Sequence, residues 1–128
     1  MRKIRMTLII LSHIVNIVVV TIIPFLIFTN APSMVEAYGP DTPARRILAC
    51  LYATIALTSA ATLVMLAMGR VQAVLWVSAA LFAIQTVYKV GTWPTVGLGH
   101  PVVNANLMIS VLHAASLAFV FIRLSRPI

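Results

Sequence analysis

The stretch MTLIILSHIVNIVVVTIIPFLIF, from Met6 to Phe28, contains no Asp, Glu, Lys or Arg. About 20 consecutive apolar residues are enough to cross the hydrocarbon core of a bilayer as an α-helix. In lipid every backbone N–H and C=O group must be bonded within the protein, so a helix is the default conformation of such a segment. The stretch therefore predicts a membrane-spanning helix over residues 6–28.

The composition of the whole chain is that of a membrane protein. Its 128 residues are 62% hydrophobic and 9% charged, and their mean hydropathy is +1.07. Soluble domains carry about 25% charged residues, because a small body has a large surface in water. The net charge is +7, but the basic residues lie at the ends of apolar runs and not on one polar face. This distribution excludes a nucleic-acid-binding protein.

Three further stretches are apolar and long enough to cross a bilayer; they cover residues 47–68, 71–90 and 102–124. Their length and their lack of alternation favour helices over the strands of a membrane barrel. We therefore expect one transmembrane domain over residues 1–128, an all-α integral membrane four-helix antiparallel bundle. Its longer loops are predicted over residues 29–46 and 91–101.

The positions of Lys and Arg predict the orientation of this bundle, because these residues concentrate on the cytoplasmic side. Arg45 and Arg46 lie on one side, and Lys89 lies ambiguously at the end of the third span. The other six lie on the opposite side: Arg2, Lys3, Arg5, Arg70, Arg123 and Arg126. The sequence thus predicts a multi-pass protein of the cell inner membrane with both termini in the cytoplasm.

The first outer loop contains Glu36 and Asp41, the only acidic residues of the chain. We expect Asp41 to cap or turn into the second spanning helix, and VEAY, residues 35–38, to form a short interfacial helix. The alternative is an outward-facing pocket for a ligand or a partner, lined by Glu36, Asp41, Lys89, Trp93 and His100. The single Cys50 is expected to be a small buried residue.

Polar residues inside the predicted spans form a second group of candidates, because polar groups are costly in lipid and often mark functional sites. This group consists of His13, Asn16, Gln85, Asn106 and His113. One interpretation makes His13 and His113 the axial ligands of a haem held between facing helices. The other makes them structural hydrogen-bonding residues. Two histidines give no metal-ligand spacing, so no metal site is predicted.

The stretch MVEAYGPDTPARRILACLYATIALTSA, residues 34–60, resembles the DoxX-like group of small four-helix membrane proteins. In that group a short outer segment after the first helix carries a Tyr-Gly pair, then acidic and basic residues leading into a second helix rich in small residues. Tyr38, Gly39, Asp41 and Arg46 stand at comparable places here. The resemblance implies a four-helix membrane fold with an accessory or redox-associated role.

A non-enzymatic accessory subunit, or a protein that binds a small ligand or lipid, is the function that the sequence favours. No nucleophile–base pairing and no glycine-rich phosphate loop are visible. A homo-oligomeric transporter or channel for a small solute is the alternative, since four helices are few for a pathway in one copy. A haem-binding redox protein using His13 and His113 is the third. The expected partners are the lipid bilayer and a larger membrane complex or a second copy; the cofactor, haem or quinone, is left open.

Overall fold

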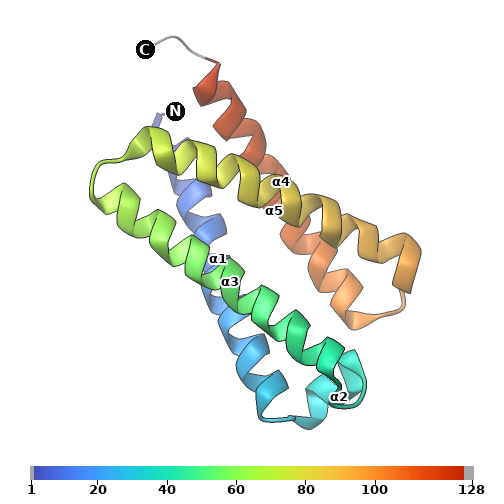
Figure 1. Ribbon diagram of the computed structural model, residues 1–128. Coiled ribbons are helices and arrows are strands. Elements are labelled where there is room, and N and C mark those ends of the chain that lie inside the picture. Colours follow the sequence, from blue (N-terminus) through green and yellow to red (C-terminus); the bar gives the residue numbers. More distant parts are fainter. Residues whose placement is uncertain (1, 126–128) are drawn as a thin grey trace. The chain divides into compact units, whose positions relative to one another are not determined.

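The computed structural model describes residues 2–125, and the side chains from Met6 onward. Within this part of the chain it consists of helices without any strand, which confirms the all-α fold class (Figure 1). The helices are α1 (Arg2–Phe28), α2 (Pro32–Tyr38), α3 (Pro43–Ala67), α4 (Val71–Val96) and α5 (Pro101–Leu124). All but α2 are long and apolar enough to cross a membrane. The short α2 includes the predicted VEAY helix.

The third spanning helix is longer than the sequence indicated. The prediction ended it at Val90, whereas α4 continues through Gly91 and Pro94 to Val96. Within this last part the hydroxyls of Thr92 and Thr95 donate to backbone carbonyls of the preceding turn, at 2.6 and 2.8 Å. The predicted loop over 91–101 is therefore shortened to residues 97–100.

The connection between α3 and α4 is a tight helix ending around Gly69. Gly69 has a φ of +76°, the left-handed conformation that glycine adopts without steric cost. The N–H of Gly69 donates to Leu66 O at 2.9 Å, and the N–H of Arg70 donates to Met65 O at 3.0 Å. This pair of bonds is a Schellman motif, which satisfies carbonyls that the end of a helix leaves open.

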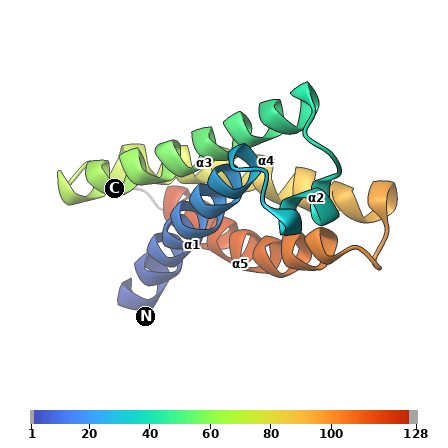
Figure 2. The same ribbon diagram turned by 90° about the horizontal axis from the view of Figure 1, so that it is seen from below.

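The described chain divides into two compact units, and each is described by itself. The first unit contains the chain up to Ser12 and from Thr62 onward. Its main feature is the pair α4 and α5, which lie side by side in both views (Figure 1 and Figure 2). The apolar core of this unit joins residues of α1, α4 and α5: Ile9, Leu75, Ala79, Phe82 and Val120.

The second unit covers His13–Ala61, with most of α1, the short α2 and the greater part of α3. Asn16 Nδ2 of α1 donates to Ser59 Oγ of α3 at 3.1 Å. The rings of Tyr38 and Tyr52 meet edge to face, with centroids 6.5 Å apart. Small side chains such as Ala56 are buried on α3, and small residues allow spanning helices to approach closely.

Replacing Gly69 by Ala tests the tight helix ending. An added Cβ would meet nothing within 4 Å, so the change acts through the positive φ alone. We expect Gly69→Ala to lower the free energy of unfolding in detergent by about 1 kcal/mol. Gly91→Ala is the matched control, because Gly91 is helical and its added Cβ also meets nothing. That variant should be neutral or stabilising by up to about 1 kcal/mol; equal losses in both variants would contradict the assignment.

Candidate functional site

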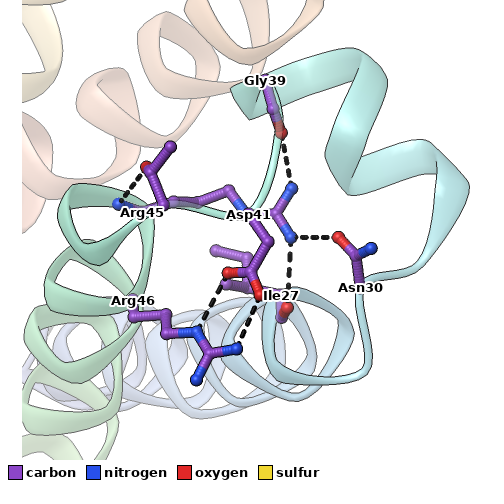
Figure 3. A network of polar contacts seen from close by, with 7 residues as sticks. Ile27, Asn30, Gly39, Asp41, Arg45 and Arg46 are labelled. Carbon is purple, nitrogen blue, oxygen red and sulfur yellow. Dashed lines mark hydrogen bonds and ion pairs between the residues drawn. The ribbon is translucent and has the colours of Figure 1, made fainter.

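Arg45, in the first turn of α3, organises the polar segment between α1 and α3. Its side chain is buried, with 3% of its surface exposed. Its guanidinium donates to the carbonyl of Gly39 and to Asn30 Oδ1, and more weakly to the carbonyl of Ile27 at 3.4 Å (Figure 3). Asn30 has a φ of +51°, a conformation that Asn tolerates better than most residues. One cation thus ties the end of α1 and the end of α2 to the start of α3.

The residue that caps α3 is Thr42, so of the two roles expected for Asp41 the cap is wrong, whereas Asp41 does lie in the bend before α3. Thr42 Oγ1 accepts a hydrogen bond from the backbone N–H of Arg45 at 3.2 Å, the bond expected of an N-cap residue. Pro43 follows at the first helical position, where its missing N–H costs nothing. Asp41 instead accepts two hydrogen bonds from Arg46, at 3.0 and 2.6 Å.

The Asp41–Arg46 pair lies on an open surface hollow of about 510 Å³, lined also by Thr42 and Pro43. The hydrogen bond from Arg46 is the main cause that holds the pKa of Asp41 below its ordinary 3.8. This pair therefore contributes to stability fully when the pH is above the ordinary pKa of Asp41, and the contribution is lost as the pH falls through the lowered pKa. Since the two charges satisfy each other, the hollow offers a ligand no unpaired charge.

The five residues of the predicted outward-facing pocket belong to different units. Glu36, exposed on α2, and Asp41 lie in the second unit. Lys89, Trp93 and His100 lie in the first. Trp93 is half-exposed near the end of α4. His100 caps α5, since its Nδ1 accepts from the N–H of Val102 at 3.3 Å.

The buried face of α4 changes from apolar to polar along the helix. Phe82, Gln85 and Lys89 follow one another on this face at intervals of one turn, and all three are buried. The buried face of α5 carries polar residues at the same spacing: Asn106, Ser110, His113 and Ser116. Polar faces of this kind inside membrane-spanning helices mark sites of interaction between helices or with ligands.

Lys89 is the charged residue of this face and its partners are neutral. Its Nζ donates to Asn106 Oδ1 at 3.2 Å and lies 5.0 Å from the ring centroid of Tyr88. Asn106 Nδ2 in turn donates to Thr92 Oγ1 at 3.4 Å. Only 2% of the Lys89 surface is exposed. The ammonium is therefore held by an amide oxygen and an aromatic ring, with no carboxylate in this network.

The two histidines of the haem hypothesis lie in different units. His113 is fully buried on α5, where its ring stacks on Phe82 with centroids 5.0 Å apart and an interplanar angle of 13°. His13 is buried on α1, in the second unit. The stacking on Phe82 gives the His113 ring a structural partner. Ligation of a haem by these residues stays a prediction.

Ser12 and Ser116 form a polar link that the sequence analysis missed. Their hydroxyls are 2.8 Å apart, and Ser116 Oγ also donates to the carbonyl of Leu8 at 3.1 Å. The signal was present in the sequence, because Ser116 follows His113 by one turn on the face that carries Asn106. The link joins α1 to α5 within the first unit.

Gln85 is the residue of the polar face that packing does not explain. Its side chain is fully buried, and neither amide atom forms a hydrogen bond within residues 6–125. The neighbouring Thr86 hydroxyl is also buried without a hydrogen-bond partner in that part of the chain. Leaving a buried polar group unbonded costs about 1–3 kcal/mol. A leucine would fill such a position at no such cost.

Comparison of the chain with known protein families, with curated proteins and with solved structures found no match. Two places stand out: the Arg45 network of the second unit and the polar face of α4 and α5 in the first.

Removing the Arg45 guanidinium should destabilise the second unit. We expect Arg45→Gln to lower the free energy of unfolding by about 1–3 kcal/mol, since it removes the charge-assisted, partly buried hydrogen bonds to Gly39 O and Asn30 Oδ1. Arg46→Gln is the matched control, because it removes the same charge from the next residue and breaks only an exposed ion pair. Exposed pairs contribute little, so this variant should show no resolvable loss. Chemical unfolding in detergent measures both; equal effects would contradict the assigned role of Arg45.

Proposed function

We propose that this protein is a multi-pass protein of the inner membrane whose four long helices form an antiparallel bundle with both termini in the cytoplasm. The location in a membrane is supported by the four helices that are long and apolar enough to cross one. The orientation is supported by the distribution of Lys and Arg: six of these residues, Arg70 among them, lie on the side of the two termini, and such residues concentrate on the cytoplasmic side. The resemblance of residues 34–60 to the DoxX-like group agrees with this plan and remains part of the proposal.

The proposed orientation can be tested by labelling single cysteines in intact cells. In a Cys50→Ala background, Ser33→Cys should react with a membrane-impermeant maleimide, because Ser33 is exposed on α2 at the proposed outer side. Met68→Cys, exposed beside the α3–α4 turn, should react only after the cells are opened. Both positions should react in detergent, which controls for accessibility. The reverse pattern, or labelling of both in intact cells, would refute the proposed orientation.

Within the membrane we propose that the protein binds a small ligand or a lipid at the polar face of α4 and α5, as an accessory protein and not as an enzyme. The observation that carries this proposal is Gln85, a fully buried amide without a hydrogen bond within residues 6–125. A spanning helix that only packs against its neighbours has no use for such a residue. A ligand that bonds to the amide would remove its cost.

Three further features support the same place. Lys89 lies one turn from Gln85 on the buried face of α4. Asn106 and Ser110 lie on the buried face of α5, which packs beside α4. The ring of Phe82 stacks on His113 and gives this face an apolar end. A few polar groups beside apolar rings are typical of small-molecule sites. Partners such as a larger membrane complex or a second copy are compatible with a ligand held there.

Gln85→Leu separates a ligand contact from a packing residue. Without ligand, the variant should unfold at higher temperature than the wild type, because it removes a buried unbonded amide. Native mass spectrometry after mild extraction from membranes should find a small molecule or lipid bound to the wild type and lost from Gln85→Leu. Gln72→Leu, at an exposed position of the same helix, should retain it. A wild type without any bound species, or equal retention in Gln85→Leu, would contradict the proposed site.

A further inference from the structure

We propose that the ligand of this site carries an anionic oxygen group, a phosphate or a carboxylate, and that Lys89 binds it. This inference rests on the proposed function, because it names the chemistry of a ligand at the same polar face. The group has two sources with the same chemistry: the headgroup of an anionic lipid and a free small anion. The charge balance, the donors of Lys89 and the position of Gln85 support it.

Among its described residues the first unit contains no Asp or Glu that could balance Lys89. The only acidic residues of the chain are Glu36 and Asp41, and both belong to the second unit. Asp41 is already paired with Arg46. A buried cation is costly unless it is paired and hydrogen-bonded, and the cost is greatest inside a membrane-spanning helix. Because Lys89 is 2% exposed and the described part of its own unit supplies no Asp or Glu, an anionic group of a ligand is a counter-charge that would stabilise it.

The ammonium of Lys89 also has donors to spare. An ammonium carries three N–H groups, and within the described residues one oxygen, Asn106 Oδ1, accepts from it. The ring of Tyr88 attracts the charge but supplies no oxygen. A phosphate or carboxylate supplies both the missing acceptors and the opposite charge, and such charge-assisted bonds are about twice as strong as neutral ones.

Gln85 lies four residues before Lys89, so the two side chains share one face of α4. Its amide N–H can donate to a second oxygen of the same anion, which accounts for the group that packing leaves unbonded. Lys89 lies seven residues before the end of α4 at Val96, which is about 10 Å along the helix axis. A charged group bound there is within reach of the membrane surface, and the apolar part of a ligand would extend toward Phe82.

Trp93 provides a local probe of this site, because it follows Lys89 by one turn on α4. The only other tryptophan is Trp76, so Trp76→Phe leaves Trp93 as the single reporter. In this background the protein is studied in phosphatidylcholine nanodiscs. One arm titrates inorganic phosphate and acetate against chloride at constant ionic strength. The other arm replaces part of the phosphatidylcholine by phosphatidylglycerol. Trp93 fluorescence and the unfolding temperature are measured in both arms.

We expect a saturable change of Trp93 fluorescence and a higher unfolding temperature in one arm, and this arm identifies the source of the anion. Lys89→Gln should raise the apparent dissociation constant for the anion about thirtyfold or more. This is the effect of removing one partner of a buried charge pair. Arg70→Gln is the matched control, because it removes an exposed charge from the other end of α4 and should leave the response unchanged. Lys89→Gln should unfold no earlier than the wild type without ligand, since the new amide can still bond to Asn106.

Three results would overturn the inference. An unchanged response in Lys89→Gln would show that the anion binds elsewhere. A lower unfolding temperature of Lys89→Gln, with no response of the wild type in either arm, would make the Lys89–Asn106 bond purely structural. Retention of an uncharged species by the wild type and by Lys89→Gln in native mass spectrometry would refute the anion and leave the proposed function intact. A wild type that retains nothing and responds to neither arm refutes both.

Discussion

Inside a bilayer a polar group can bond only to the protein or to something that the protein holds, and this constraint governs the whole structure. It forces the four long segments into helices, whose backbone groups bond within each segment. It also acts on side chains. Ser12 bonds to Ser116, Asn16 bonds to Ser59, and the hydroxyl of Thr54 turns back to the carbonyl of Cys50. These polar side chains of the spanning helices thus form their hydrogen bonds within the chain.

The same constraint explains why the polar face of α4 and α5 is unusual. The partners of Lys89 are neutral and leave its charge unbalanced. The side chain of Gln85 forms no hydrogen bond within residues 6–125. The Arg45 network shows what the chain does when it needs a buried cation for structure alone. There the two terminal nitrogens of the guanidinium donate to oxygen atoms of α1, the α1–α2 turn and the α2–α3 connection. Both cations have neutral partners, but three oxygen atoms accept from Arg45 and one accepts from Lys89. This difference in acceptors is the physical basis for assigning structure to Arg45 and ligand binding to Lys89.

The sequence predicted the spanning helices well, because the length and apolarity of a run are enough to indicate a membrane span and do not depend on distant contacts. The prediction was wrong at positions where the local preference of a residue differs from what its surroundings in the fold require. Gly91 and Pro94 suggested a loop, yet α4 continues through both. Cys50 was expected to be buried, but it lies on an exposed face of α3. Thr42 took the capping role expected of Asp41, because Asp41 pairs with Arg46.

The candidate site was predictable only as a set of residue types. Hydropathy singled out Gln85, Asn106 and His113 as polar residues within spans, and Lys89 was a candidate for the outward-facing pocket. Their partners depend on how α4 packs beside α5. No sequence pattern indicated that Phe82 would stack on His113 or that Thr92 would hold Asn106. Arg45 was read as one charge of an outer loop, since the acceptors that surround it come from three separate segments.

The burial of Arg45 also determines where a protease can cut the folded protein. Within residues 29–46 the only basic side chains are Arg45 and Arg46; the first is enclosed and both belong to the opening turn of α3. Trypsin needs an accessible basic side chain on an extended segment, so this long connection is resistant although most of it is exposed. Arg70 is exposed between α3 and α4, but its backbone is bonded to both helices within the tight turn, so the resistance extends to this connection.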